Sequence, residues 1–339
     1  MSRIAIIGAG SWGTALALVL ARRDKHDAMH SITLWSHTAK VADTIARTRE
    51  NSTYLPGLPV PASIRVTTEL ESAVRAAEII LLVVPSEHLR SICGTMAPLL
   101  HSNQLIVSAT KGIEDGTYLR MTQVIAEVLA IHQLELPCGV LSGPSFAQEV
   151  GAGSPTAITI ASADATLAAR IQEEFAGPTL RLYTNDDVVG VELGGALKNA
   201  IAIAAGATCG LRLGHNSVAA LITRGIAEMT RLAVACGGQS DTLAGLSGLG
   251  DLVLTCTGAL SRNRHVGLEL GRGRKLQEIL LEMHGKVAEG VRTTHAALGL
   301  ADRLGVEMPI TEQIGAILME RISAKDAMRE LMSRPGRDE

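Results

Sequence analysis

Aromatic side chains are scarce in this chain, which has two Trp, three Tyr and two Phe among its 339 residues. Sites for single-stranded nucleic acid stack bases on aromatic rings, so this scarcity argues against such a site. Neither sign of charge dominates, because 31 Lys and Arg stand against 34 Asp and Glu, for a net charge of −3. The composition therefore predicts no nucleic-acid partner and no attraction to an anionic membrane surface.

Long apolar runs and paired cysteines are also missing. No uninterrupted apolar stretch reaches the roughly 18 residues that a membrane-spanning helix needs. The spacing of Cys93, Cys138, Cys209, Cys236 and Cys256 matches no metal-binding or redox motif, so we interpret them as small buried hydrophobes. Met1-Ser2-Arg3 leads directly into the first predicted strand, so we expect no signal peptide. These features predict a cytoplasmic protein with no membrane insertion and no metal.

Aliphatic residues fill the chain instead, which is 47% hydrophobic with a mean hydropathy of +0.24. Apolar runs typical of buried strands occur at 4–7, 32–35, 79–84, 105–108, 138–141, 156–161 and 180–183. Helical segments separate several of them, which predicts a parallel sheet covered on both faces. Residues 188–332 are nearly all helical in pattern, with glycine-rich turns such as 245–250.

We therefore predict an α/β fold with two domains. A doubly wound, Rossmann-type domain would span 1–187, an all-α domain 188–334, and a tail 335–339. In this architecture ligands bind at the carboxyl ends of the strands, so we expect the active site in a cleft between the domains.

The most informative motif is Gly-x-Gly-x-x-Gly at 8–13, which follows the strand 4–7 and precedes a predicted helix at 14–22. Gly8 permits a tight turn, Gly10 lets the backbone approach a pyrophosphate, and Gly13 lets the helix pack on the strand. The free N–H groups of a helix start favour a phosphate there. We predict a bound dinucleotide; a tight turn with a purely structural role is the alternative.

The second strand ends at Ser36-His37 without the Asp or Glu that usually holds the ribose 2′-hydroxyl of NAD. Ser36, His37 and the nearby Arg47 and Arg49 would tolerate a 2′-phosphate. The sequence therefore favours NADPH, with NAD as the alternative cofactor.

Lys198 lies in the otherwise apolar run 193–205, which predicts a buried helix. Lysine is seldom buried without a partner or a function. Burial would disfavour the ammonium form and lower its pKa toward neutrality, which suits a proton-transfer group. Gly194 and Gly195, one turn earlier, would let a ligand approach. The alternative is a lysine that extends to solvent at the helix edge.

Three other polar residues follow strands or glycine-rich turns. Lys111 comes just after the strand 105–108, where ligands bind in this architecture, although a solvated charge is equally compatible. Ser145 follows the strand 138–141, where small residues and Pro144 would suit backbone close to a ligand, although this segment taken alone favours an ordinary strand-to-helix turn. Asp251 could be an N-cap of a helix over 252–255, or could accept hydrogen bonds from a substrate hydroxyl or Lys198.

Ser261-Arg262-Asn263-Arg264 begins a predicted helix that ends at Gly271, with Ser261 as N-cap. Two arginines in a first turn oppose the helix dipole unless an anion binds there. We therefore favour a phosphate site over a solvated basic turn.

These segments together resemble a known family over essentially the whole chain. Its motifs lie at 8–13, 109–112, 142–147, 194–199, 248–256, 261–264, 287–290 and 308–312. They are similar to those of the NAD(P)-dependent sn-glycerol-3-phosphate dehydrogenases of the bacterial soluble type. The resemblance implies a helical domain like that of 6-phosphogluconate dehydrogenase.

The resemblance also implies the reaction, which is reversible NAD(P)H-dependent reduction of dihydroxyacetone phosphate to sn-glycerol 3-phosphate. It further implies a homodimer that supplies glycerophospholipid synthesis. Lys198 would be the proton donor or acceptor, with Lys111 and Asp251 as further catalytic residues. The implied substrate-binding residues are Lys111, Gly143, Ser145, Lys198, Asp251, Ser261, Arg262 and Asn263. The implied nucleotide-binding residues are Gly8, Gly10, Ser11, Trp12, Gly13, His37, Lys111, Ala147, Arg262, Val287 and Glu289.

Two other functions stay open on the sequence. One is a different hydroxyacid dehydrogenase with a sheet domain and a helical domain, of the 3-hydroxyacid or 6-phosphogluconate type. The other is a nucleotide sensor without catalysis, although a desolvated lysine costs stability that a sensor has no need to bear.

Overall fold

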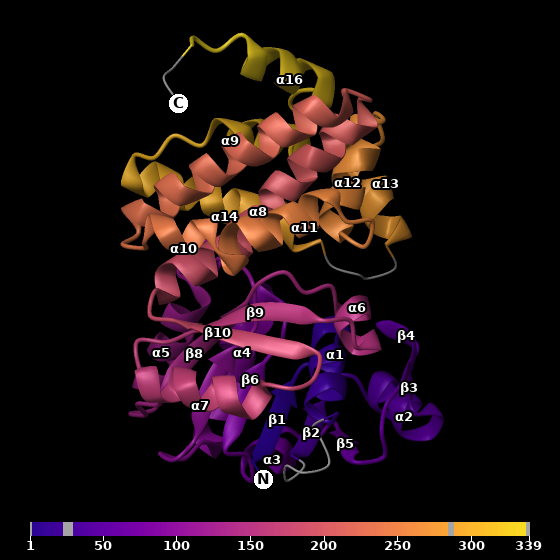
Figure 1. The fold of residues 1–339 in the computed structure, drawn as a ribbon, viewed down its shortest axis with the longest axis vertical. Helices are drawn as coiled ribbons and strands as arrows, with labels where there is room; N and C mark the ends of the chain where they lie inside the picture. Colours follow the sequence, from indigo (N-terminus) through magenta and orange to yellow (C-terminus); the bar gives the residue numbers. More distant parts are fainter. Residues whose placement is uncertain (1, 23–29, 284–287, 337–339) are drawn as a thin grey trace. The chain divides into compact units, whose positions relative to one another are not determined.

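The computed structural model describes residues 2–22, 30–283 and 288–336. Contacts within the chain form two compact units (Figure 1). The sheet unit comprises Met1–Lys111 and Met121–Val188, and the helical unit comprises Gly112–Arg120 and Val189–Glu339. The sequence placed 1–187 in one domain, whereas these contacts assign Gly112–Arg120 to the helical unit.

The sheet unit contains, within the described residues, an eight-stranded sheet in the order β10-β9-β8-β7-β6-β1-β2-β5 and a small pair β3-β4. The strands are β1 (Arg3–Ile7), β2 (Ser31–Trp35), β3 (Glu50–Asn51), β4 (Leu55–Pro59), β5 (Ile64–Thr67), β6 (Ile79–Leu82), β7 (Leu105–Ser108), β8 (Cys138–Ser142), β9 (Thr156–Ala161) and β10 (Leu180–Asn185). All seven predicted runs coincide with strands of the large sheet, although β6 ends at Leu82 rather than at residue 84, and the Rossmann-type fold is confirmed. The short strands at 50–67 were not predicted.

The sheet is not parallel throughout, which corrects the prediction. From β5 to β8 every neighbouring pair is parallel, but β9 runs antiparallel to β8, and β10 is parallel to β9. Between β8 and β9 lies α6 (Ala147–Ala152), whose six residues span about 9 Å. The connection that contains α6 joins β8 and β9 as antiparallel neighbours.

Helices cover both faces of the sheet. The remaining helices of the sheet unit are α1 (Ser11–Leu20), α2 (Ala39–Thr48), α3 (Leu70–Val74), α4 (Ser86–Met96), η1 (Ala97–Leu99), α5 (Met121–Ile131) and α7 (Ala165–Phe175). Residues of α1, α2, α6 and α7 share one core cluster with alternate strand residues such as Ile4, Ile6, Ile79 and Leu81. The intervening residues, such as Ala5 and Ile80, are equally buried, so the sheet has two apolar faces.

The helical unit is built around one apolar helix. Its helices are α8 (Val188–Gly210), α9 (Gly214–Ala235), α10 (Ser240–Ala244), η2 (Leu246–Gly250), α11 (Asp251–Thr257), α12 (Arg262–Gly271), α13 (Leu276–Glu282), α14 (Glu289–Leu304), α15 (Pro309–Leu318) and α16 (Ala324–Met332). Among the described residues, α8 alone is long and apolar enough to span a membrane, but 89% of its most apolar window is buried. It is therefore the core helix of this unit. Of the predicted tail, Pro335 and Gly336 follow the last helix, and 337–339 lie outside the described residues.

The segment Gly112–Arg120 belongs to the helical unit because its side chains pack there. Ile113 is buried in the core of that unit, and Arg120 pairs with the buried Glu192 of α8. The Arg303 guanidinium lies 4.3 Å from the Tyr118 ring and donates to the Thr117 carbonyl at 3.0 Å. The segment is thus fixed to α8 and α14 immediately after Lys111 in the sequence.

A buried carboxylate links α9 to α15. Glu228 accepts hydrogen bonds from the backbone N–H groups of Ile310, at 2.5 Å, and Thr311, at 3.2 Å. Both groups lie in the first turn of α15, where N–H groups lack partners within the helix. Burial raises the pKa of Glu228 from 4.5 to about 7, although these hydrogen bonds and Arg231 oppose the rise.

Candidate active site

The glycine-rich turn has the three features that the motif predicts. Gly8 has φ +124, in the region that favours glycine. A Cβ on Gly13 would overlap the Gly8 carbonyl, so the helix can pack this closely on the turn after β1 only because residue 13 has no side chain. A Cβ on Gly10 would meet nothing within 4 Å. Gly10 therefore faces the open space that a pyrophosphate requires.

The following helix begins earlier than predicted. α1 starts at Ser11 rather than at residue 14 and ends at Leu20, with Gly10 as its N-cap residue. Ser11 and Trp12 therefore belong to its first turn, whose N–H groups are suited to bind phosphate. The Ser11 hydroxyl donates to the Tyr54 carbonyl at 2.7 Å, and the buried Trp12 indole N–H has no acceptor within the described residues.

At the end of β2, the structure leaves fewer cations for a 2′-phosphate than the sequence offers. Arg49 is not available, because its guanidinium donates to the carbonyls of Val60 and Ile64, at 3.0 and 3.3 Å, and of Pro61. His37 is exposed directly after the strand, and Arg47 is exposed in the last turn of α2. Ser36 is buried and bonds to the Thr38 carbonyl.

Lys111 and Ser145 both approach the carbonyl of Gly143. The Lys111 ammonium lies 3.4 Å from this oxygen, and the Ser145 hydroxyl donates to it at 2.9 Å. Gly143 has φ +138 just after β8, and a Cβ there would press on Ile158. Ala147 begins α6. The structure thus brings together the predicted residues that follow β7 and β8.

Lys198 is the centre of a buried polar cluster in the helical unit. Its side chain is 8% exposed and does not extend to solvent, so the alternative of an exposed lysine is wrong. Its Nζ donates to Asp251 Oδ1 at 2.6 Å and to Thr255 Oγ1 at 2.8 Å. The Asp251 carboxylate, 1% exposed, favours the charged ammonium and opposes the effect expected from burial alone.

Asp251 and Thr255 reach Lys198 together because they lie one turn apart on α11. Asp251 is the first residue of α11 and Gly250 is its N-cap residue, so the N-cap alternative for Asp251 is wrong, and its pairing with Lys198 is the supported alternative. The predicted turn at 245–250 is instead a π-helical turn, η2, continuous with α11. A Cβ on Gly194 would press on the Ser247 carbonyl, so Gly194 admits this turn rather than a ligand.

The helix α12 begins as predicted, with Ser261 as N-cap. Its hydroxyl oxygen accepts from the Arg264 N–H at 3.1 Å, which leaves the hydroxyl hydrogen available to a ligand. Arg262 is exposed in the first turn of α12. Asn263 is buried, donates to Asn199 Oδ1 at 2.9 Å and accepts from the Gly290 N–H at 3.0 Å. Asn263 therefore joins α8, α12 and α14, a structural role that the sequence did not indicate.

Two predicted nucleotide contacts remain. Glu289 is the first residue of α14 and is half-buried. Val287 lies outside the described residues.

The family described as NAD-dependent glycerol-3-phosphate dehydrogenase N-terminus matches residues 3–168, and its C-terminus counterpart matches residues 187–329. The chain belongs to the NAD-dependent glycerol-3-phosphate dehydrogenase family.

Similar proteins and a similar structure agree with this family. Glycerol-3-phosphate dehydrogenase [NAD(P)+] of Acidobacterium capsulatum is 62% identical over 100% of both chains. That of Koribacter versatilis is 58% identical over 100% of this chain and 99% of its own. The crystal structure of glycerol-3-phosphate dehydrogenase from Coxiella burnetii has a TM-score of 0.92 and 42% identity, over 98% of this chain and 99% of that chain.

Two residues of this dehydrogenase that contact predicted site residues or the glycine-rich turn, Thr255 and Asn51, were not predicted from the sequence. Thr255 could have been found from its spacing of four after Asp251 on an expected helix. Asn51 could not, because it ends the short strand β3, which was not predicted, and its partners Ala9 and Thr14 are 42 and 37 residues away.

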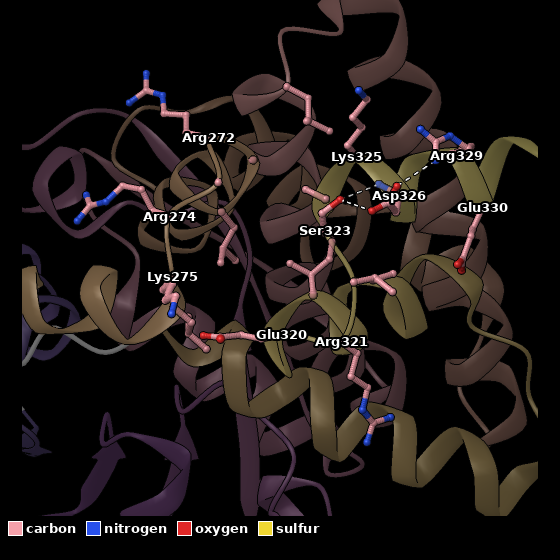
Figure 2. A pocket seen from close by; sticks show the side chains of 18 residues that line it. Arg272, Arg274, Lys275, Glu320, Arg321, Ser323, Lys325, Asp326, Arg329 and Glu330 are labelled. Atoms are coloured by element: carbon pink, nitrogen blue, oxygen red, sulfur yellow. Dashed lines mark hydrogen bonds and ion pairs between the residues drawn. The ribbon is translucent and has the colours of Figure 1, made fainter.

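The helical unit also has a hollow of about 870 Å³ between the turns at 271–276 and 320–326, shown in Figure 2. None of the predicted site residues lines it. Its cations are Arg272, Arg274, Lys275, Arg321, Lys325 and Arg329. Carboxylates pair with three of them, and Figure 2 shows Arg321 pointing away from Lys325 and Arg329. The hollow therefore lacks convergent positive charge for an anion.

Proposed function

We propose that this dehydrogenase reduces dihydroxyacetone phosphate to sn-glycerol 3-phosphate with NAD(P)H. The observation that carries the proposal is the buried Lys198, held by Asp251 and Thr255 in a member of this family. A charged lysine aligned in this way can donate a proton to an oxygen on which negative charge develops.

The glycine-rich turn fits a dinucleotide, because Gly10 faces open space at the start of α1. Gly8, Gly10, Ser11, Trp12 and Gly13 would hold its pyrophosphate. When bound, the reduced nicotinamide supplies the hydride for C2 of the substrate. His37 and Arg47 would bind the 2′-phosphate of NADPH, the cofactor that we favour.

Lys198 would protonate the C2 oxygen as the carbonyl π bond breaks, and Asp251 would hold the ammonium in place. Lys111 would supply a second positive charge, and Gly143 and Ser145 would contact the substrate. Arg262 and the Ser261 hydroxyl would bind its phosphate, so that remote binding energy orients the carbonyl. Asn263 would support this helix start through Asn199 and Gly290.

We also infer a cytoplasmic homodimer that supplies glycerophospholipid synthesis, with Ala147 and Glu289 near the nucleotide. The deciding experiment follows the loss of reduced nicotinamide absorbance with dihydroxyacetone phosphate, in parallel with NADH and NADPH. We expect turnover with both nucleotides and a higher kcat/KM with NADPH. Nucleotide binding without turnover would support the sensor instead.

A further inference from the structure

Asn51 is buried against the glycine-rich turn and uses both ends of its side-chain amide. Nδ2 donates to the Ala9 carbonyl at 2.9 Å and to Thr14 Oγ1 at 2.8 Å, and Oδ1 accepts from the Tyr54 N–H at 3.2 Å. The Ala9 oxygen can only accept and the Tyr54 N–H can only donate, so this orientation of the amide is the one that satisfies both. The side chain is 1% exposed, which protects these bonds from competing water.

Ala9 lies between Gly8 and Gly10, at the centre of the turn. The peptide that joins Ala9 to Gly10 is trans, so its carbonyl and its N–H point in opposite directions. Holding the Ala9 oxygen on the Asn51 side therefore directs the Gly10 N–H to the other side. Within the described residues that N–H has no acceptor.

Without this restraint the peptide has freedom to turn over. Glycine tolerates backbone conformations that other residues avoid, and glycines flank Ala9 on both sides. A reversed peptide would present a carbonyl oxygen, rather than an N–H, to an anion. The partial negative charge of that oxygen, beside the open space at Gly10, would then repel a pyrophosphate.

We propose that Asn51 is a positioning residue that orients the Ala9–Gly10 peptide, so that the Gly10 N–H faces the pyrophosphate of the nicotinamide dinucleotide. This rests on the nucleotide site proposed above. Asn51 and Leu55 belong to the strand pair β3-β4. Leu55 is 2% exposed and packs in the apolar core, so this pair has an anchor that does not depend on Asn51.

The test compares Asn51→Ala with Thr14→Val. Thr14→Val removes only the hydrogen bond from Asn51 Nδ2 to Thr14 Oγ1, whereas Asn51→Ala removes that bond and also releases the Ala9 carbonyl and the Tyr54 N–H. Dissociation constants are measured for NADH and for ADP-ribose, which has the pyrophosphate but no nicotinamide. The KM for dihydroxyacetone phosphate is measured at saturating nucleotide, and thermal melts report folding.

We expect Asn51→Ala to weaken both ligands by the same factor, about 10–100-fold, the effect of one hydrogen bond to a charged group. The KM for dihydroxyacetone phosphate should not change. Thr14→Val should lower the melting temperature but leave both dissociation constants within about twofold of wild type, a shift well below that effect.

Equal weakening in both variants would indicate general loosening and overturn the proposal, as would unchanged affinity in Asn51→Ala. A wild-type protein that bound neither ligand would overturn the nucleotide site itself, a distinguishable result. If Asn51→Ala does not fold, exchange of the Asn51 side-chain amide protons in wild type decides. Slow exchange with and without ADP-ribose supports the proposal, and release on binding refutes it.

Discussion

Replacing Lys198 by Met tests the proposed proton donor, and the structure predicts two separate effects. Turnover should fall by about 10²–10⁴, the usual contribution of a positioned acid. The protein should also lose about 3–5 kcal/mol of stability, because Asp251 would keep a buried charge without its lysine.

The double variant Lys198→Met/Asp251→Asn separates these effects. It removes the uncompensated carboxylate, so most of the lost stability should return. Turnover should stay as low as in the single variant, because no ammonium is restored. Denaturant melts give the free energy of unfolding, and stopped-flow absorbance with saturating NADPH gives the rate of reduction.

Nucleotide affinity is the internal control, since Gly8–Gly13 and Lys198 belong to different units. Both variants should bind NADPH as wild type does. Turnover that recovered together with stability in the double variant would refute the reasoning, because the loss would then come from misfolding.

Three other predictions follow from named contacts. The folded protein holds the Glu228 proton more tightly than the unfolded chain does, so the stability that this proton contributes is complete below pH 4.5 and lost as pH rises through about 7. Relative to Glu228→Gln, wild type should lose about 3 kcal/mol of unfolding free energy across that range, and a constant difference in denaturant melts would contradict this. Gly10→Ala should melt like wild type but bind nucleotide weakly, whereas Gly13→Ala should melt lower because its Cβ overlaps the Gly8 carbonyl; equal melting temperatures would be inconsistent with this contact. Arg262→Ala should raise the KM for dihydroxyacetone phosphate but not for unphosphorylated dihydroxyacetone, and similar losses with both substrates would argue against a phosphate contact.

Local sequence patterns were enough to predict seven of the eight strands of the large sheet and the features that depend on local spacing. Apolar runs located seven strands because buried strands need continuous apolar residues. The spacing 8–13 predicted the glycine-rich turn because Gly8 and Gly13 each meet a local steric requirement that a side chain would violate. Ser261 was predicted as an N-cap because its hydrogen-bond partner, the Arg264 N–H, is only three residues further along the sequence.

Contacts between residues that are distant in the sequence could not be predicted and came from the folded structure. Lys198 and Asp251 are 53 residues apart, and Asn51 and Ala9 are 42 apart, so no local pattern encodes either pair. Arg49 has the charge expected of a phosphate ligand, yet backbone carbonyls of 60–64 occupy it. The segment 112–120 reads as a connection within the sheet domain, but its anchors Glu192 and Arg303 come from helices far along the chain. Backbone conformation depends largely on neighbouring residues in the sequence. A buried polar group, in contrast, needs a hydrogen-bond partner, and the fold determines which distant group lies close enough to provide it.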